Sequence, residues 1–140
     1  MRIAAGILVV LSVAPGIAAA CELRIESAWI RAAPPRSASL AGYATLVNSG
    51  ARARRIVAAE TRAAAVVLFH ESRMQGAMAS MRELDGISVP AGGRVELAPG
   101  GRHLMLMALS SDLRAGDHLT ITLIDATGCR IAGDFVVRAR

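Results

Sequence analysis

Between His70 and Met107 the sequence reads HESRMQGAMASMRELDGISVPAGGRVELAPGGRHLMLM. Three short runs, at 79–84, 94–97 and 103–109, are separated by stretches that contain glycine and proline. One turn is Pro90-Ala91-Gly92-Gly93 and another is Pro99-Gly100-Gly101. Short runs between such turns are typical of β-strands rather than helices. This stretch therefore predicts an all-β domain.

The same pattern continues on both sides of that stretch. Further strands are predicted at 23–31, 42–47, 55–60, 64–70, 119–124 and 131–138. In the first of these, Ile25 and Trp29 are expected to share one face, because alternate residues of a strand point the same way. The Ala-rich segment 58–65 is expected to allow one helical turn, but no segment shows a sustained helical period. Many short strands with glycine-rich turns predict a sandwich or a barrel.

The first twenty residues, MRIAAGILVVLSVAPGIAAA, have the features of a secretory signal peptide. Arg2 is followed by a short apolar run and then by the small residues Ala18-Ala19-Ala20, a typical cleavage site. The apolar run is shorter than the roughly 20 residues needed to cross a bilayer. We therefore expect a signal peptide at 1–20 and a single exported domain at 21–140. A buried first helix is the alternative.

Two cysteines in an exported chain predict a disulfide between Cys21 and Cys129. Such a bond would tie the N-terminal strand to the last connection between strands. In the chain-entropy model it would stabilise the fold by at most about 4–5 kcal/mol. The alternative is that Cys21, the first residue after cleavage, is free or is acylated as in a lipoprotein. Acylation is disfavoured because Ala18 lies where such signals usually carry leucine.

The charge of the chain does not indicate nucleic-acid binding. The formal net charge is +5, and all 16 basic residues are arginines, most of them dispersed along the chain. Aromatic residues make up only 3% of the sequence, too few for a platform on which single-stranded nucleic acid could stack. We interpret the charge as a contribution to solubility and to the steering of a partner.

Histidine and methionine are concentrated in the quoted stretch. It contains two of the three histidines and every methionine except the initiator. Thioether sulfur is a soft, neutral ligand that suits Cu(I), and imidazole also suits copper. Because His103 and Met105 are two residues apart on a predicted strand, they can bind one ion from the same face. The stretch therefore predicts a soft-metal site.

At these residues the sequence resembles the periplasmic PCu(A)C copper chaperones. Their signature is a histidine, ten residues, a methionine, twenty-one residues and then His-x-Met, and it is matched here by His70, Met81, His103 and Met105. Four flanking words also resemble the family: AWIRAAPP at 28–35, AGYATLVNSG at 41–50, PGGRHLMLM at 99–107 and AGDHLTITL at 115–123. The resemblance covers about 28–137.

The resemblance implies both a fold and a function. The fold would be a cupredoxin-like Greek-key β-sandwich. The four residues that match the signature would hold Cu(I), and the protein would deliver it to the copper centre of a respiratory haem-copper oxidase. The partners would be the copper-bearing subunit of the oxidase and a thioredoxin-like copper protein. The chain itself is expected to be a monomer that meets the membrane only through its partner.

The remaining candidate residues receive other interpretations. Met107 shares a strand face with Met105 but is expected to fill the core. Met74 and Met78 are either a soft rim around the site or packing residues. His118 is expected to be a solvated turn residue. Glu71 stands where some family members have an extra methionine, so a fifth sulfur ligand is not expected there, and the chain ends VVRAR rather than in a Met- and His-rich tail.

Enzymatic activity is not expected. The sequence has no recognisable nucleophile and base set, no paired carboxylates and no phosphate-binding loop. Four protein ligands would close a tetrahedral site, whereas a catalytic metal keeps an open position. A blue-copper electron carrier would need a thiolate ligand. The alternatives to delivery are copper sequestration for tolerance and a metal-free β-sandwich interaction module.

Overall fold

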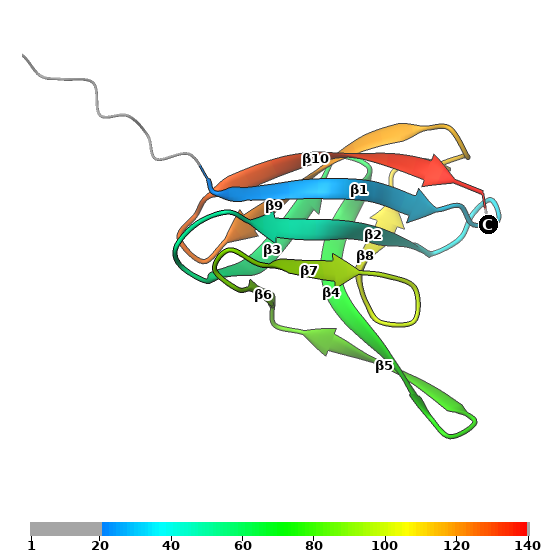
Figure 1. Ribbon diagram of the computed structural model, residues 1–140. Coiled ribbons are helices and arrows are strands. Elements are labelled where there is room, and N and C mark those ends of the chain that lie inside the picture. The colour runs from blue at the N-terminus through cyan, green and yellow to red at the C-terminus, as the bar shows by residue number, and fades with distance from the viewer. Residues whose placement is uncertain (1–20, 140) are drawn as a thin grey trace, which may run out of the picture.

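The computed structural model describes residues 21–139, so the predicted signal peptide at 1–20 lies outside the described residues. Ten strands and no helix make up the described part of the chain (Figure 1). The strands are β1 (Leu23–Arg31), β2 (Ser39–Asn48), β3 (Arg54–Thr61), β4 (Ala64–Gln75), β5 (Met78–Leu84), β6 (Ile87–Val89), β7 (Arg94–Leu97), β8 (Arg102–Leu109), β9 (His118–Asp125) and β10 (Arg130–Arg138). Between residues 21 and 139, no helix is long and apolar enough to cross a membrane.

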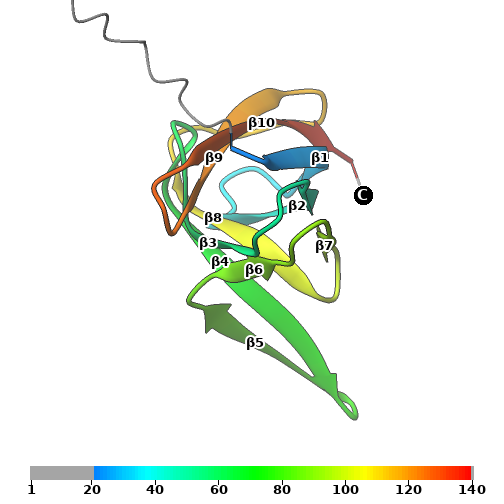
Figure 2. The ribbon, with the colours of Figure 1, turned by 60° about the vertical axis from the view of Figure 1, so that its left-hand side comes forward.

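The strands form one sheet that closes on itself. Its hydrogen-bonded order runs β4-β8-β2-β1-β10-β9-β3, and a further pairing of β3 with β4 completes the ring. β5, β6 and β7 are added to this ring by pairing with β4, β3 and β2. The β1–β10 pair is parallel and the other described pairs are antiparallel. Figure 2 shows the strands curving around a common interior, so the sheet forms a barrel, one of the two architectures that the strand pattern predicted.

Alternating apolar side chains fill that interior. In β9 the buried positions are Leu119, Ile121, Leu123 and Asp125, and the residues between them are exposed or partly exposed. This period of two is what a strand with one face on a core requires. Burying each large apolar side chain contributes about 1.5–3 kcal/mol before the entropy of folding is counted. The other large apolar side chains that are almost fully buried are Phe135, Ile30, Leu46, Ile56, Ile87, Leu104, Leu106, Val89 and Val137.

A bulge in β1 overturns the expectation that Ile25 and Trp29 share a face. The β1–β2 register shifts between Glu26 and Trp29, and Ser27 has a positive φ of 51°. A bulge adds one residue to a strand and so reverses the alternation beyond it. Ile25 packs against the core, whereas after the bulge Ile30 takes the fully buried position. Trp29 is therefore turned to the outer face of the barrel.

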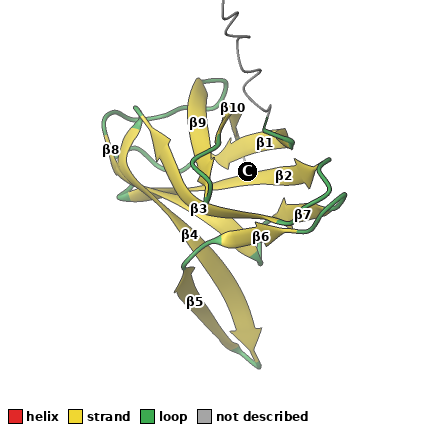
Figure 3. Ribbon diagram, turned by 90° about the vertical axis from the view of Figure 1, so that its left-hand side faces the viewer, coloured by secondary structure: helices red, strands yellow, loops and turns green. Residues whose placement is uncertain are grey.

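Three other expectations about local structure need correction. The Ala-rich segment 58–65 contains no helix: residues 58–61 and 64–65 lie in strands β3 and β4, and residues 62–63 form the turn between them. The three-residue strand Ile87–Val89 was not predicted. Strand β4 continues to Gln75 instead of ending at His70. Its extension and β5 form a hairpin that projects from the barrel, as Figures 1 and 3 show.

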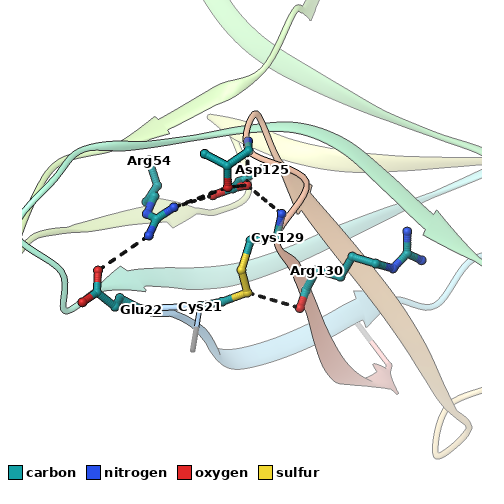
Figure 4. Close-up of a disulfide and its surroundings, with 7 residues drawn as sticks. Cys21, Glu22, Arg54, Asp125, Cys129 and Arg130 are labelled. Atoms are coloured by element: carbon teal, nitrogen blue, oxygen red, sulfur yellow. Dashed lines mark hydrogen bonds and ion pairs between the residues drawn. A yellow bond between two sulfur atoms is a disulfide. The ribbon is translucent and has the colours of Figure 1, made fainter. Parts of the chain in front are cut away.

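The predicted disulfide between Cys21 and Cys129 is confirmed, with the two Cα atoms 6.0 Å apart. It joins Cys21, two residues before β1, to the connection between β9 and β10 (Figure 4). Asp125 organises that turn. Its Oδ1 accepts hydrogen bonds from the backbone N–H groups of Thr127 and Cys129 at 2.9 Å, and its Oδ2 lies 3.2 Å from Nη1 of Arg54. The bridge is thus anchored on a turn that a buried carboxylate holds in shape.

The surroundings of Asp125 keep its carboxyl group ionised. Burial would raise the pKa of Asp125, because a charged carboxylate loses its hydration. Hydrogen bonds from Thr127 and from the backbone of Cys129, together with the charge of Arg54, outweigh burial and hold the pKa below its usual range. The folded state therefore favours the charged form of this residue.

Candidate metal site

Two histidines lie opposite each other on neighbouring strands. His70 of β4 and His103 of β8 are register partners, with ring centroids 5.9 Å apart and ring planes at 73°. The next pair on that face is Leu68 with Met105. Because Leu104 is fully buried in the core, its neighbours His103 and Met105 point to the outer face of the barrel. The pair predicted from sequence, His103 and Met105, therefore shares a face with His70.

Met81 joins this group from a third strand. It is the register partner of Ser72, which lies two residues beyond His70 in β4, so His70 and Met81 share a face of the hairpin. The sulfur of Met81 lies 3.1 Å from Nδ1 of His70. Three strands thus bring together the four residues that were predicted as ligands.

His103 is held in the orientation and tautomer of a metal ligand. Its Nδ1 lies 3.1 Å from the carbonyl oxygen of Gly101, which can only accept, so Nδ1 carries the proton. Nε2 is then left with a free lone pair. Fixing one imidazole nitrogen by a hydrogen bond to a carbonyl is a common way to orient a histidine that binds a metal through the other. His103 is only 3% exposed, so this arrangement is protected from water.

An aromatic wall closes one side of the candidate site. The ring of Tyr43, a 5% exposed residue, has its centroid 6.3 Å from that of His103 and 4.6 Å from that of Trp29. The guanidinium of Arg31 lies over both aromatic rings, and that of Arg138 lies over the indole. The sequence interpretation did not assign Trp29 or Tyr43 to the site. The available signal was that both lie in words shared with the resembled family, AWIRAAPP and AGYATLVNSG.

The other side of the candidate site is open. Met81 is 53% exposed, in contrast to His103, and the whole of β5 before Leu84 is exposed. Met105 is half-buried between these extremes. A bound ion would therefore have protected ligands on the barrel and an accessible ligand on the projecting hairpin.

The donor set fits a soft cation. Among residues 21–139, no group of three or more histidine, cysteine, aspartate or glutamate side chains is arranged to hold a metal ion. Two imidazoles and two thioethers are neutral, and the thioethers match Cu(I). The assignment of His70, Met81, His103 and Met105 as ligands remains a prediction.

Glu71 does not take part in the cluster. It lies on the opposite face of β4 from His70, and its Oε2 is 2.9 Å from both Arg73 and Arg82. The hydrogen bond from Arg82, with a second from Arg73, holds the pKa of Glu71 below its usual range despite some desolvation. Its charge is thus neutralised by two arginines on its own face.

The other predicted roles are partly wrong. Met107 does not fill the core, because it is 39% exposed on the outer face, where it lies opposite Val66. Met74 and Met78 are 69% and 75% exposed, which excludes a packing role for either. His118 begins strand β9 and its Nδ1 lies 2.9 Å from Oδ2 of Asp134, so it is exposed but has a partner.

One surface depression lies away from the candidate site. Its volume is about 770 Å³, and it lies beyond the end of β8 that is remote from His103. It is lined by Glu60, Thr61, Arg62, Ala63, Ser110, Ser111, His118, Leu119, Thr120 and Thr122. The one imidazole in it is that of His118, which is already bonded to Asp134. The histidine and methionine cluster therefore remains the candidate metal site.

The described structure is a closed β-barrel with a candidate soft-metal site on its outer face. The chain belongs to the LpqE-like family of putative lipoproteins, whose model matches residues 23–137. One curated relative, the putative lipoprotein Lxx21020 of Leifsonia xyli subsp. xyli, is 34% identical over 102 residues. The match covers 72% of this chain, and it spans about 60% of the length of that relative.

Solved PCuAC domains have the same fold. The copper-bound PCuAC domain from PmoF2 is 28% identical, with a TM-score of 0.72 over 87% of this chain and 97% of that domain. The solution structure of Cu(I)-DR1885 from Deinococcus radiodurans is 30% identical, with a TM-score of 0.68 over 86% of this chain and 81% of that protein. The prediction of an all-β, cupredoxin-like fold is therefore confirmed.

Proposed function

We propose that this chain is an exported Cu(I)-binding chaperone that holds one ion with His70, Met81, His103 and Met105. The observation that carries the proposal is the convergence of these residues from β4, β5 and β8, with Nε2 of His103 left free by the hydrogen bond at Nδ1. The similarity to a copper-bound domain and to a Cu(I)-loaded protein supports copper as the cargo. The cluster has no thiolate, which an electron-transfer copper site would need.

The unequal exposure of the ligands supports carriage with release. His103 is shielded by the aromatic wall, whereas Met81 lies on the open hairpin. A recipient with cysteine thiolates can reach Met81 first, and a thiolate is a stronger ligand for Cu(I) than a neutral thioether. The ion then passes by stepwise exchange of ligands, without a change in its oxidation state. The recipient we propose is the copper centre of a respiratory haem-copper oxidase, with a thioredoxin-like copper protein as a second partner.

The location that we propose is the periplasm. A signal peptide at 1–20 would export a single domain at 21–140. The descriptions of the family and of the curated relative as putative lipoproteins support an envelope location. In the folded chain, however, the sulfur of Cys21 is bonded to Cys129 and is not available for a lipid thioether. We therefore propose a chain that is exported but is not anchored through Cys21.

Titration of the protein with Cu(I) and with Zn(II) tests the binding function. We expect one Cu(I) per chain, with both sulfur and nitrogen neighbours in X-ray absorption, and much weaker binding of Zn(II). The expectation rests on the two thioethers, which discriminate in favour of Cu(I). Zinc that competes on equal terms, or bound copper without sulfur neighbours, would refute the proposed site. No binding at all would favour a metal-free interaction module.

A further inference from the structure

One face of the β4–β5 hairpin carries a third thioether beside the candidate site. The register pairs Ser72 with Met81 and Met74 with Ala79. Alternate residues of a strand share a face, so His70, Ser72 and Met74 lie on the same side as Met81. This surface, which bears His70, Met74 and Met81, is called the thioether face below. Strand β4 runs from the barrel into the projecting hairpin (Figure 3), so this face extends toward the tip of the hairpin.

The opposite face of the hairpin has a different chemistry. It carries Glu71, whose carboxylate is paired with Arg73 and Arg82. Met78, the register partner of Gln75, belongs to this face. Met78 lies in the pair that closes the hairpin turn and Met74 in the next pair. The two are similarly exposed, at 75% and 69%, but only Met74 faces the same way as the predicted ligands.

On the thioether face, the strand partners of Met81 and Met74 are small residues. Met74 is diagonal to Met81 across the hairpin, and diagonal neighbours have Cβ atoms about 7–8 Å apart, within reach of long side chains. Their immediate partners, Ser72 and Ala79, are small. Glu83, opposite His70 on this face, offers hard oxygen ligands that match Cu(I) poorly. Met74 is thus an additional soft donor on the same face, two register pairs closer to the hairpin tip than Met81.

We propose that Met74 is a transit ligand, which binds Cu(I) as the ion enters or leaves the site along the thioether face. The inference rests on the proposed function. In the outward step a bond forms between Cu(I) and Sδ of Met74 while His70 and Met81 stay bound, and the bonds to Met105 and His103 break. Every ligand is neutral and the ion remains Cu(I), so no proton or electron moves. The loaded protein at rest uses the four predicted ligands and leaves Met74 free.

Met78 provides a matched control for this step. The test uses the chain with its disulfide intact, as wild type and as the Met74→Leu and Met78→Leu variants. Leucine keeps the apolar volume but removes the sulfur. The equilibrium affinity for Cu(I) is measured first by competition with bicinchoninate. Stopped-flow mixing then measures Cu(I) loading, and also release to bathocuproine disulfonate, extrapolated to zero chelator.

A transit ligand lowers the barrier in both directions without changing the end states. We therefore expect Met74→Leu to slow loading and release alike, by about five- to tenfold, and to leave the affinity within about twofold of wild type. Met78→Leu is expected to match wild type in all three measurements. Equal rates in all three proteins, or equal slowing in both variants, would overturn the transit role. An affinity loss of about tenfold or more in Met74→Leu would also overturn it, because Met74 would then be a resident ligand. Failure of the wild type to bind Cu(I) would refute the proposed function as well.

Discussion

At the scale of single residues, His103 differs from the other two histidines in that its surroundings hold its ring in one orientation. Its ring is buried, its Nδ1 is bonded to the Gly101 carbonyl, and one side of it is covered by Tyr43. His70 is only partly buried and its Nδ1 faces the sulfur of Met81. His118 is exposed and bonded to Asp134. His103 is therefore the preorganised donor, and its removal should cause a large loss of affinity for Cu(I).

Replacing His103 or Met105 by alanine should weaken Cu(I) binding by about a hundredfold or more. Loss of a residue that merely orients a ligand typically costs 10–100-fold in metal affinity, and loss of the ligand itself should cost at least as much. His118→Ala is the control and should leave the affinity unchanged. The measurement is competition with a Cu(I) chelator. Equal losses in all three variants would indicate nonspecific binding to the surface.

A second residue, Asp125, makes stability depend on pH. Its pKa is lowered in the folded state, so the stabilisation that it provides is present above its unfolded pKa of about 3.9. It is lost as the pH falls from there through the folded pKa. Asp125→Asn should lower the free energy of unfolding by about 2–3 kcal/mol at neutral pH, since several bonds to a charged group are lost.

Urea denaturation of wild type and Asp125→Asn between neutral pH and pH 3 checks this prediction. The difference between the two proteins should be largest near neutrality and should shrink below about pH 4. Glu26→Gln is a suitable control, because Glu26 also has a lowered pKa, through its hydrogen bond with Arg24, but lies in an exposed pair. A difference that does not vary with pH would show that the charge of Asp125 is not what stabilises the turn.

At the scale of strands and turns, two local features set the geometry of the site. The bulge at Ser27 turns Trp29 outward, where it stacks on Tyr43 beside His103. The extension of β4 to Gln75 creates the projecting hairpin, which places Met81 across from Ser72. Without the bulge the aromatic wall would lose Trp29, and without the extension of β4 the site would lose Met81 as an accessible ligand.

The disulfide between Cys21 and Cys129 gives a prediction at the same scale. Protein recovered from the cell envelope should have no free thiol, because Cys21 and Cys129 are bonded to each other. Intact mass with alkylation, before and after reduction, measures this directly. Removal of the bond by a Cys129→Ala substitution should cost about 2–5 kcal/mol of stability. Two thiols that alkylate without reduction, or a lipid mass on Cys21, would contradict the prediction.

At the scale of the whole molecule, the projecting hairpin gives the barrel a side on which a partner can dock. Loops and hairpins carried on a rigid scaffold are accessible to partners. The barrel holds His103 and Met105 in place, while the hairpin presents Met81 to the outside. The combination of protected ligands on the barrel and an exposed ligand on the hairpin supports direct transfer between proteins rather than release of the ion into solution.

Copper-loaded protein should transfer Cu(I) to the soluble domain of an oxidase subunit that carries a copper site with cysteine and histidine ligands. Direct exchange predicts that transfer proceeds even when a chelator is present to trap free ion. Mass spectrometry of the mixture follows the copper on both proteins. Interception of all the copper by the chelator would exclude direct delivery. Retention of oxidase activity in a deletion strain under copper limitation, together with reduced copper tolerance, would indicate sequestration instead.

The β class and most strand positions could be predicted because both depend on local chemistry. Strands β1 and β7 were predicted with the bounds that the structure has. The disulfide also followed from two cysteines in an exported chain. The short strand Ile87–Val89 and the extension of β4 were missed. Their residues form strands because they pair with β3 and β5, and no local signal marks those pairings.

The amino-acid order alone was enough to select the predicted ligands, because their type and spacing are properties of the chain. It was not enough to place the residues around them. Trp29 is on the outer face only because a bulge reverses the alternation of β1, and Met107 is exposed rather than in the core because Leu104 and Leu106 occupy the inward positions. Met74 and Met78 differ only through the register of the hairpin, which assigns them to opposite faces. Alternation depends on neighbouring residues in sequence, whereas register depends on the partner strand, so these last distinctions required the folded chain.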